Sequence, residues 1–190
     1  MIDKALLFIQ NYLNDELKKS LGTSKDFVVA SSLVNPDGSV IAITQNKVVI
    51  SIINLEHETF VKWQNNVRSD TGMTMGKVAT PVFLNLYVLI SSNHDNYMEA
   101  LKRLSTVIGA FQARPYFSSQ DSPSMPAPIT KLTLEIFNVP ITELSHIWSG
   151  IGAKYVPSIL YKMRMIAIQE NQLLKEVPTV SGLGNNVKRS

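Results

Sequence analysis

The sequence predicts an α+β fold in which a mixed, mostly antiparallel sheet is packed by helices. Three observations support this prediction. The run from Pro81 to Ile90 is apolar on both alternating faces, as expected for a central strand that is covered on each side. An amphipathic helix follows this strand. The other patterns place a helix and three strands before this pair, and a strand, a helix and a strand after it.

The central strand has two apolar faces. One face carries Val82, Leu84, Leu86, Val88 and Ile90, and the other carries Phe83, Tyr87 and Leu89 with Asn85. A half-exposed strand would alternate polar and apolar residues, so layers are needed on both sides of this one. The polar stretch 91–95 is expected to break the strand before the next helix.

The helix after this break has an apolar stripe at three- and four-residue steps, formed by Tyr97, Leu101, Leu104, Ile108 and Phe111. Asn96 is expected to cap it, with Glu99 reaching back as in a capping box. Pro115 ends it. Because strand and helix must cover each other, we expect the centre of the core at Leu84, Leu86, Val88, Leu101, Leu104 and Ile108.

The chain begins with a helix whose apolar stripe consists of Ile2, Leu6, Ile9, Leu13 and Leu17. Asp3 is its expected N-cap, and Gly22 can take the left-handed conformation at its C-terminus. The sequence 35–38, Asn-Pro-Asp-Gly, has the residues of a type I turn. Strands near 27–34 and 39–44 are therefore predicted to pair as a hairpin, followed by a buried strand over 47–55.

After the central helix, residues 118–128 form a proline- and serine-rich surface loop. Apolar residues alternate with polar ones at 132–136, which predicts a half-exposed strand. A short helix over 140–150 turns Leu144, Ile147 and Trp148 inward, and Gly150 or Gly152 ends it. The last strand, 159–169, directs Tyr161, Met163 and Met165 to one face and Lys162 and Arg164 to the other. We expect one α+β domain over 1–169 and a C-terminal tail over 170–190.

Two segments, 56–80 and the tail, show no clear pattern. Long connections in compact domains are usually functional or disordered, so 56–80 is either a mobile hairpin tip or an arm that contacts a partner. The segment contains bulky apolar residues, and a lone subunit gains little by exposing them. This favours an arm that contacts a partner. The candidate subunit or partner contacts are Phe60, Trp63, Met73 and Met75 in the first segment, and Leu173, Leu174, Val177 and Val180 in the tail.

The composition excludes several classes of function. The chain has no cysteine, which removes disulfides, thiolate metal sites and cysteine nucleophiles. The net charge is only +3 and the basic residues are scattered, so no nucleic-acid partner is expected. No apolar run reaches the about 18–20 residues of a membrane helix, and we expect no membrane contact and synthesis in the cytosol.

Sequence motifs for catalysis are absent. The three histidines, His57, His94 and His146, have no motif around them, and His146 is expected to be a packing or capping residue near Trp148. No nucleophile elbow, Walker loop or zinc-protease spacing occurs. We therefore expect no catalytic residues, no metal site and no cofactor, and no enzymatic activity.

Five segments together resemble a known family in their order and spacing: 1–6, the turn 35–38, 46–56, 81–97 and 143–164. The most specific is Pro-Val-Phe-Leu-Asn-Leu-Tyr-Val-Leu-Ile-Ser-Ser-Asn-His-Asp-Asn-Tyr, from Pro81 to Tyr97. They are similar to the cap, or tail-terminator, proteins of extracellular contractile injection systems. These are the phage-tail-like particles related to the Photorhabdus virulence cassette and the antifeeding prophage. The resemblance covers Met1 to about Ile168; residues 56–80 and those after Glu170 depart from it.

The resemblance implies a terminator fold and a homo-oligomeric ring, hexameric in the family, that closes the baseplate-distal end of the inner tube and sheath. Its implied partners are further copies of the chain and the tube and sheath proteins. Assembly in the bacterial cytoplasm and release as part of an extracellular particle are implied as well. Two alternatives stay open: another structural adaptor of the tube, sheath or baseplate, and a small hydrolase or ligand-binding domain that uses His94, Asp95 or His146.

Overall fold

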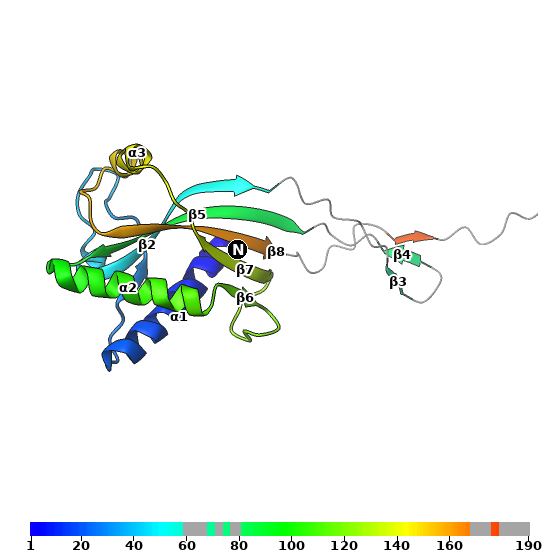
Figure 1. The fold of residues 1–190 in the computed structure, drawn as a ribbon. Helices are drawn as coiled ribbons and strands as arrows, with labels where there is room; N and C mark the ends of the chain where they lie inside the picture. The colour runs from blue at the N-terminus through cyan, green and yellow to red at the C-terminus, as the bar shows by residue number, and fades with distance from the viewer. Residues whose placement is uncertain (59–67, 71–73, 77–80, 168–175, 179–190) are drawn as a thin grey trace, which may run out of the picture.

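The computed structural model describes the backbone of residues 1–58, 68–70, 74–76, 81–167 and 176–178, and the side chains of 1–58 and 81–167. Its main sheet has six strands in the order β1-β2-β5-β8-β7-β6 (Figure 1). These strands are β1 (Val28–Ala30), β2 (Lys47–His57), β5 (Val82–Asn93), β6 (Tyr116–Ser118), β7 (Ile129–Ile136) and β8 (Ser158–Ala167). Only β1 and β2 are parallel; the other neighbours are antiparallel. The predicted mixed, mostly antiparallel α+β sheet is confirmed.

Helices cover both faces of this sheet. Helices α1 (Ile2–Leu21) and α2 (Tyr97–Ala113) lie on one face, and α3 (Ile141–Ile151) lies on the other (Figure 1). Both glycine C-caps are confirmed: Gly22 after α1 has φ 62° and Gly152 after α3 has φ 74°. At the start of α1, Met1 is the cap and Asp3 lies inside the first turn, so the predicted cap was wrong by two residues.

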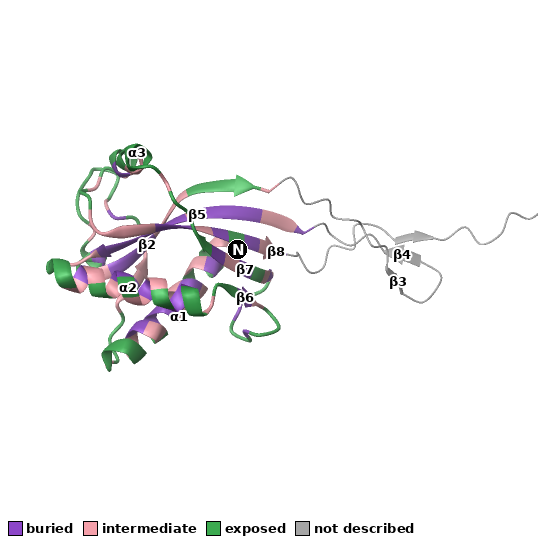
Figure 2. Cartoon of the chain, viewed as in Figure 1, coloured by how far each residue is buried: buried purple, intermediate pink, exposed green. Residues whose placement is uncertain are grey.

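Strand β5 lies between two hydrophobic clusters, as its two apolar faces predicted (Figure 2). Leu86, Val88 and Ile90 belong to the cluster under α1 and α2, and Leu89 belongs to the one under α3. The expected break at 91–95 was wrong for 91–93 and correct for 94 and 95. β5 continues to Asn93, because Ser91 and Ser92 pair with Val49 and Val48 of β2 and are fully buried. Backbone hydrogen bonding to the neighbouring strand therefore keeps these two serines in β5, although their side chains are polar.

The buried face of α2 is turned by about one residue from the predicted stripe. It consists of Ala100, Leu104, Val107, Ala110 and Phe111. Leu101 and Ile108 are only half-buried and Tyr97 is 64% exposed, so placing Leu101 and Ile108 at the core centre was wrong. Alanine at two of the inward positions suits close packing against α1, which contacts α2 directly. The predicted cap is confirmed, since the Asn96 side chain accepts hydrogen bonds from the amides of Met98 and Glu99.

The predicted hairpin across 35–38 was wrong. The turn itself forms, with the Gly38 amide bonded to the Asn35 carbonyl at 2.9 Å, but the flanking residues share only the single bridge Val34–Val40. Strand β1 pairs in parallel with β2 instead. Residues Ala42–Thr44 form a short 3-10 helix rather than a strand.

The side chain of Asn14 explains this arrangement of β1. It lies 4% exposed in the apolar stripe of α1, and its Oδ1 accepts hydrogen bonds from the amides of Phe27 and Val28, both at 2.8 Å. Its Nδ2 donates to the Val28 carbonyl at 3.2 Å. Gln10, one turn earlier, accepts from the Ala30 amide at 2.8 Å. Two amides on α1 therefore hold β1 against the sheet edge.

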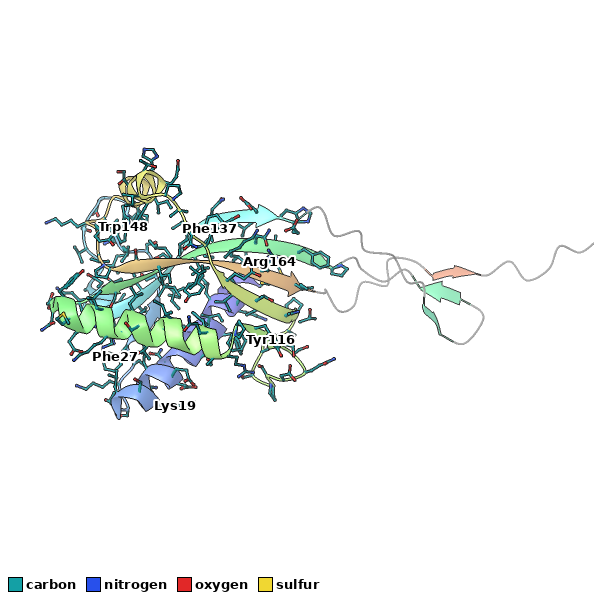
Figure 3. All side chains as sticks on the ribbon, viewed as in Figure 1. Lys19, Phe27, Tyr116, Phe137, Trp148 and Arg164 are labelled. Carbon is teal, nitrogen blue, oxygen red and sulfur yellow. The ribbon has the colours of Figure 1, made fainter. Side chains whose placement is uncertain are left out.

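The second half of the main sheet follows the prediction more closely. Tyr161, Met163 and Met165 of β8 are buried under α1 and α2, whereas Lys162 and Arg164 lie on the opposite face. Trp148 points from α3 toward the sheet (Figure 3). Two details were not predicted. The chain forms β6 directly after Pro115, and the loop 118–128 buries Ser122 and Met125.

Three short strands form a second sheet in the order β3-β4-β9. They are β3 (Arg68–Asp70), β4 (Thr74–Gly76) and β9 (Glu176–Pro178). β4 pairs with β9 antiparallel, so the 56–80 segment and the tail contribute to one sheet. The division into a domain over 1–169 and a tail over 170–190 stays a prediction.

Candidate assembly surface

Two of the eight predicted contact residues lie in the second sheet. Met75 in β4 and Val177 in β9 are register partners. The other six lie outside the described residues: Phe60, Trp63, Met73, Leu173, Leu174 and Val180. Their role as subunit or partner contacts therefore stays a prediction. The pairing of β4 with β9 shows that segment 56–80 and the tail contact each other, although they are far apart in sequence.

Both segments leave the main sheet at the same end. His57, the last residue of β2, pairs with Leu84 near the start of β5. Val82, the first residue of β5, pairs with Ala167, the last residue of β8. Strands β3, β4 and β9 lie together beyond this end of the sheet (Figure 1). The fold thus directs both segments to one side of the molecule.

The sheet face on the side of α3 is open toward this end. The α3 cluster covers Val49, Leu89 and Leu160, but further along the same face the side chains become polar. The Tyr87 hydroxyl donates to Glu56 at 2.9 Å, and Asn85 donates to Glu58 at 3.0 Å. These bonds fix a polar surface on the central strands.

The same surface continues over β8, β7 and β6. Arg164 and Glu135 form an ion pair at 3.5 Å, with both side chains about half exposed. The Lys131 ammonium lies 5.9 Å from the centre of the Tyr116 ring, which is 54% exposed (Figure 3). Charges of both signs therefore alternate across the open face. Such a surface suits a specific protein contact more than a small-molecule site.

Two clefts lie on this side of the sheet. One of about 1000 Å³ separates α3 from the turn 35–38, with Ile53, Tyr87, Phe137 and Ile147 in its wall. A second, of about 610 Å³, lies at the open end and is lined by Phe83, Asn85, Lys131, Thr133, Arg164 and Ile166 among others. Both are broad hollows between elements.

The histidines do not form a catalytic site in the described part of the chain. The Nδ1 of His94 lies 3.1 Å from the Ser92 hydroxyl, and burial, reinforced by the Arg103 cation, lowers the pKa of His94. His146 is 77% exposed and 3.8 Å from Glu143, so the predicted packing role of His146 was wrong. Among the described residues, no three histidine, aspartate or glutamate side chains are placed to share a metal ion. None of the described helices is long and apolar enough to cross a membrane.

The family assignment follows from sequence comparison. The profile of the Pvc16 N-terminal domain matches residues 7–182, which include the main sheet, its helices and both segments of the second sheet. The chain belongs to this family. Comparison with curated protein sequences finds no match.

Two solved structures share the fold of this Pvc16 N-terminal domain. The PVC sheath/tube terminator, from an extracellular contractile injection system in the extended state, matches with a TM-score of 0.57 and 14% identity, over 94% of this chain and 63% of that one. The tube-terminating cap of the anti-feeding prophage matches with a TM-score of 0.60 and 13% identity, over 94% of this chain and 60% of that one. The chain thus spans less than two thirds of either protein. At this identity the likeness shows the fold, which is the one the sequence resemblance implied.

Proposed function

We propose that this chain is a structural cap, or terminator, subunit. In this role it closes the baseplate-distal end of the inner tube and sheath of a phage-tail-like contractile injection system. The chain works as a homo-oligomeric ring, hexameric as the resemblance implies, and its partners are the tube and sheath proteins. It assembles in the bacterial cytoplasm and becomes part of a particle that is released.

One observation carries this proposal. The family match and the structural likeness concern the same domain. The family profile covers residues 7–182, and the two terminator structures match over 94% of the chain. They therefore apply to the whole α+β body and not to a shared accessory module. Fold alone does not determine function, so the placement of the surface residues has to be consistent with the role.

The placement of the two segments supports the role. A terminator has to contact its neighbours in the ring and also the last subunits of a polymer. Residues 56–80 and 170–190 leave one end of the sheet, beside an open face of mixed charge. Segments 59–80 and 168–190 together carry the whole net charge of +3, because acidic and basic residues balance in the rest of the chain. We therefore expect their contact surface on the polymer to be acidic.

An enzymatic role has no support from the described side chains. One ring nitrogen of His94 is hydrogen-bonded to the Ser92 hydroxyl. His146 is exposed on α3, which lies on the opposite face of the sheet from α2 (Figure 1). We expect no turnover from this chain. Replacing each histidine by asparagine in turn should leave assembly unchanged, and a folded variant that abolishes a measured turnover would favour the enzyme.

The experiment that tests the proposal is end-labelling of purified tubes. Tubes from the same particle are mixed with the gold-labelled full chain and imaged by negative-stain electron microscopy. We expect rings with a central opening in the chain alone, and label at one end only of each tube. Label along the tube wall would favour an adaptor instead, and a chain that stays monomeric and leaves tube ends bare would contradict the proposal.

A further inference from the structure

The main sheet has a long unpaired edge at β2. Strand β1 pairs only with Val48–Ile50, and in the described part of the chain no strand lies beside Ile52–His57 on the side away from β5. The Glu58 amide donates to the Phe83 carbonyl of β5 at 2.9 Å. Because hydrogen bonding alternates along an antiparallel strand, the backbone groups of His57 and Leu55 point away from β5. An exposed edge of this kind is a template for another strand.

The opposite edge, β6, has no further strand beside it among the described residues. The Pro115 carbonyl accepts from the Leu134 amide at 2.8 Å, and the Ser119 amide donates to the Thr130 carbonyl at 3.0 Å. By the same alternation, the backbone groups of Tyr116 and the amide of Ser118 point away from β7. The Ser118 carbonyl is already used, because it accepts from the amides of Asp121 at 3.2 Å and Ser122 at 2.9 Å. Both edges of the main sheet therefore present outward-facing backbone donors and acceptors, at Leu55 and His57 of β2 and at Tyr116 of β6, that pair with no strand in the described part of the chain.

The open parts of these two edges lie in the same rows of register partners, which run across the strands. The register joins residues across five strands into two rows: Glu56–Asn85–Arg164–Thr133–Tyr116 and Glu58–Phe83–Ile166–Lys131–Ser118. Four antiparallel steps separate β2 from β6, so the two strands run in the same direction. A neighbour placed side by side would thus present its β6 parallel to β2. The edge of β2 already accepts a parallel strand, β1, at Val48–Ile50.

The side chains at the two edges are complementary. At the β2 edge, Glu56 and Glu58 lie on the open face of the sheet. At the β6 edge, Lys131 and Tyr116 lie on the same face. On the helix side, Leu55 is 43% exposed at the β2 edge. Joining the edges brings acidic and basic groups together and covers exposed apolar surface.

We propose that copies of this chain join edge to edge, with β6 of one copy added as a parallel strand to residues 55–57 of β2 in the next. This proposal rests on the ring of the proposed function and specifies the contact between its subunits. The contact is head-to-tail, because different surfaces of the two copies meet. A head-to-tail contact forms a ring when the rotation from one copy to the next closes, as the proposed function requires. The strand pair sets direction and register, and the flanking side chains supply most of the buried area.

Cysteine cross-linking tests this directly, because the chain has no cysteine of its own. Neighbouring Cα atoms in a sheet fall within the range of about 4.4–6.8 Å that a disulfide requires. Tyr116→Cys is combined in turn with Asn54→Cys, Glu56→Cys or Glu58→Cys, which share one face. The matched control combines Tyr116→Cys with Lys154→Cys, an exposed position after α3.

After mild oxidation, the Glu56 pair should give a ladder of covalent oligomers on a non-reducing gel, at least 10-fold above the control. A ladder from the Asn54 or Glu58 pair instead would support the same edges with a two-residue stagger. Rings seen by microscopy without a ladder from any pair would overturn the edge-to-edge interface and leave the proposed function standing. The absence of both rings and ladders would count against both.

A second test uses the backbone alone. Proline at an edge position whose amide faces outward is tolerated in a strand but removes that donor. We expect His57→Pro to fold with the parent's circular dichroism spectrum and to sediment as a monomer, whereas His57→Ala still forms rings. Rings from the folded His57→Pro variant, at the same concentration as from His57→Ala, would contradict the proposal.

Discussion

The side chain of Asn14 offers a sharp test of how the fold is held together. It is a buried amide in an otherwise apolar helix stripe, and it holds β1 through three hydrogen bonds to Phe27 and Val28. We predict that Asn14→Leu, which keeps the volume and loses the bonds, destabilises the protein. Asn11→Ala on the exposed side of the same helix serves as the matched control.

The magnitude follows from the groups left without partners. Both backbone amides bond Asn14 at 2.8 Å, and Val28 is 3% exposed, so water reaches its amide poorly. An unsatisfied buried donor costs about 1–3 kcal/mol, which gives roughly 2–6 kcal/mol for the pair. The control should change stability by less than about 0.5 kcal/mol.

Urea unfolding measures the loss, and hydrogen exchange at the Phe27 and Val28 amides shows where it arises. We expect faster exchange at these two amides, since β1 detaches before the rest of the sheet unfolds. An Asn14→Leu variant as stable as the parent would refute the reasoning. It would mean that volume in the stripe of α1, and not hydrogen bonding, holds β1.

Three further predictions concern the core, its pH response and the two segments. Leu86→Ala should lose about 2–5 kcal/mol in urea unfolding, because Leu86 is fully buried, whereas the half-buried Leu101→Ala should lose clearly less; equal losses would contradict the observed face of α2. Burial raises the pKa of Tyr161 from 10.0 to about 12, so the neutral hydroxyl is favoured in the folded state and stability should fall by roughly 2–3 kcal/mol as pH rises from about 10 to 12. Tyr161→Phe should remove this part of the pH dependence, and an unchanged slope would argue against the burial of the hydroxyl. Hydrogen exchange in residues 59–80 and 170–190 should slow on ring assembly, and equal protection in free and assembled protein would exclude them as contacts.

The elements that could be predicted from the sequence are those fixed by neighbours along the chain. The two apolar faces of β5 are visible in the alternation of Val82–Ile90, and each face meets its own cluster. Asn96 and the glycines after α1 and α3 act within one helical turn. Features of this kind can be predicted because they depend only on residues that are close together in the sequence.

Strand β1 shows why other elements could not be predicted. The turn 35–38 has the residues of a hairpin, but the partner of 28–30 is decided by Asn14 and Gln10, which reach across from α1. Such tertiary hydrogen bonds have no signature in the local sequence. Likewise the sequence of Ser91 and Ser92 is typical of a break, but both pair with β2, and on the other side Ser91 pairs with Ser158 of β8 and the Ser92 amide donates to the Pro157 carbonyl.

The role of the candidate assembly surface stays a prediction, and the sequence indicated some of its segments but not its sheet edges. Bulky residues in 56–80 and the tail indicated contact segments, and Met75 and Val177 turned out to be register partners. The open edges of β2 and β6 were not predicted, because an edge exists only once the strand order is known. Glu56 and Tyr116 lie in one row only because of the register across the five strands from β2 to β6, including the irregularity at Ile52–Asn54.

The length distribution of particles tests the central claim most directly. Cells that express the whole particle are compared with cells that lack only this chain, and with cells in which the full chain is restored. Lengths of tubes and sheaths are measured by electron microscopy. A terminator predicts uniform lengths in the first and third cells, and long, variable or unsheathed tubes in the second. Particles of normal, uniform length without this chain would contradict its role as the terminator.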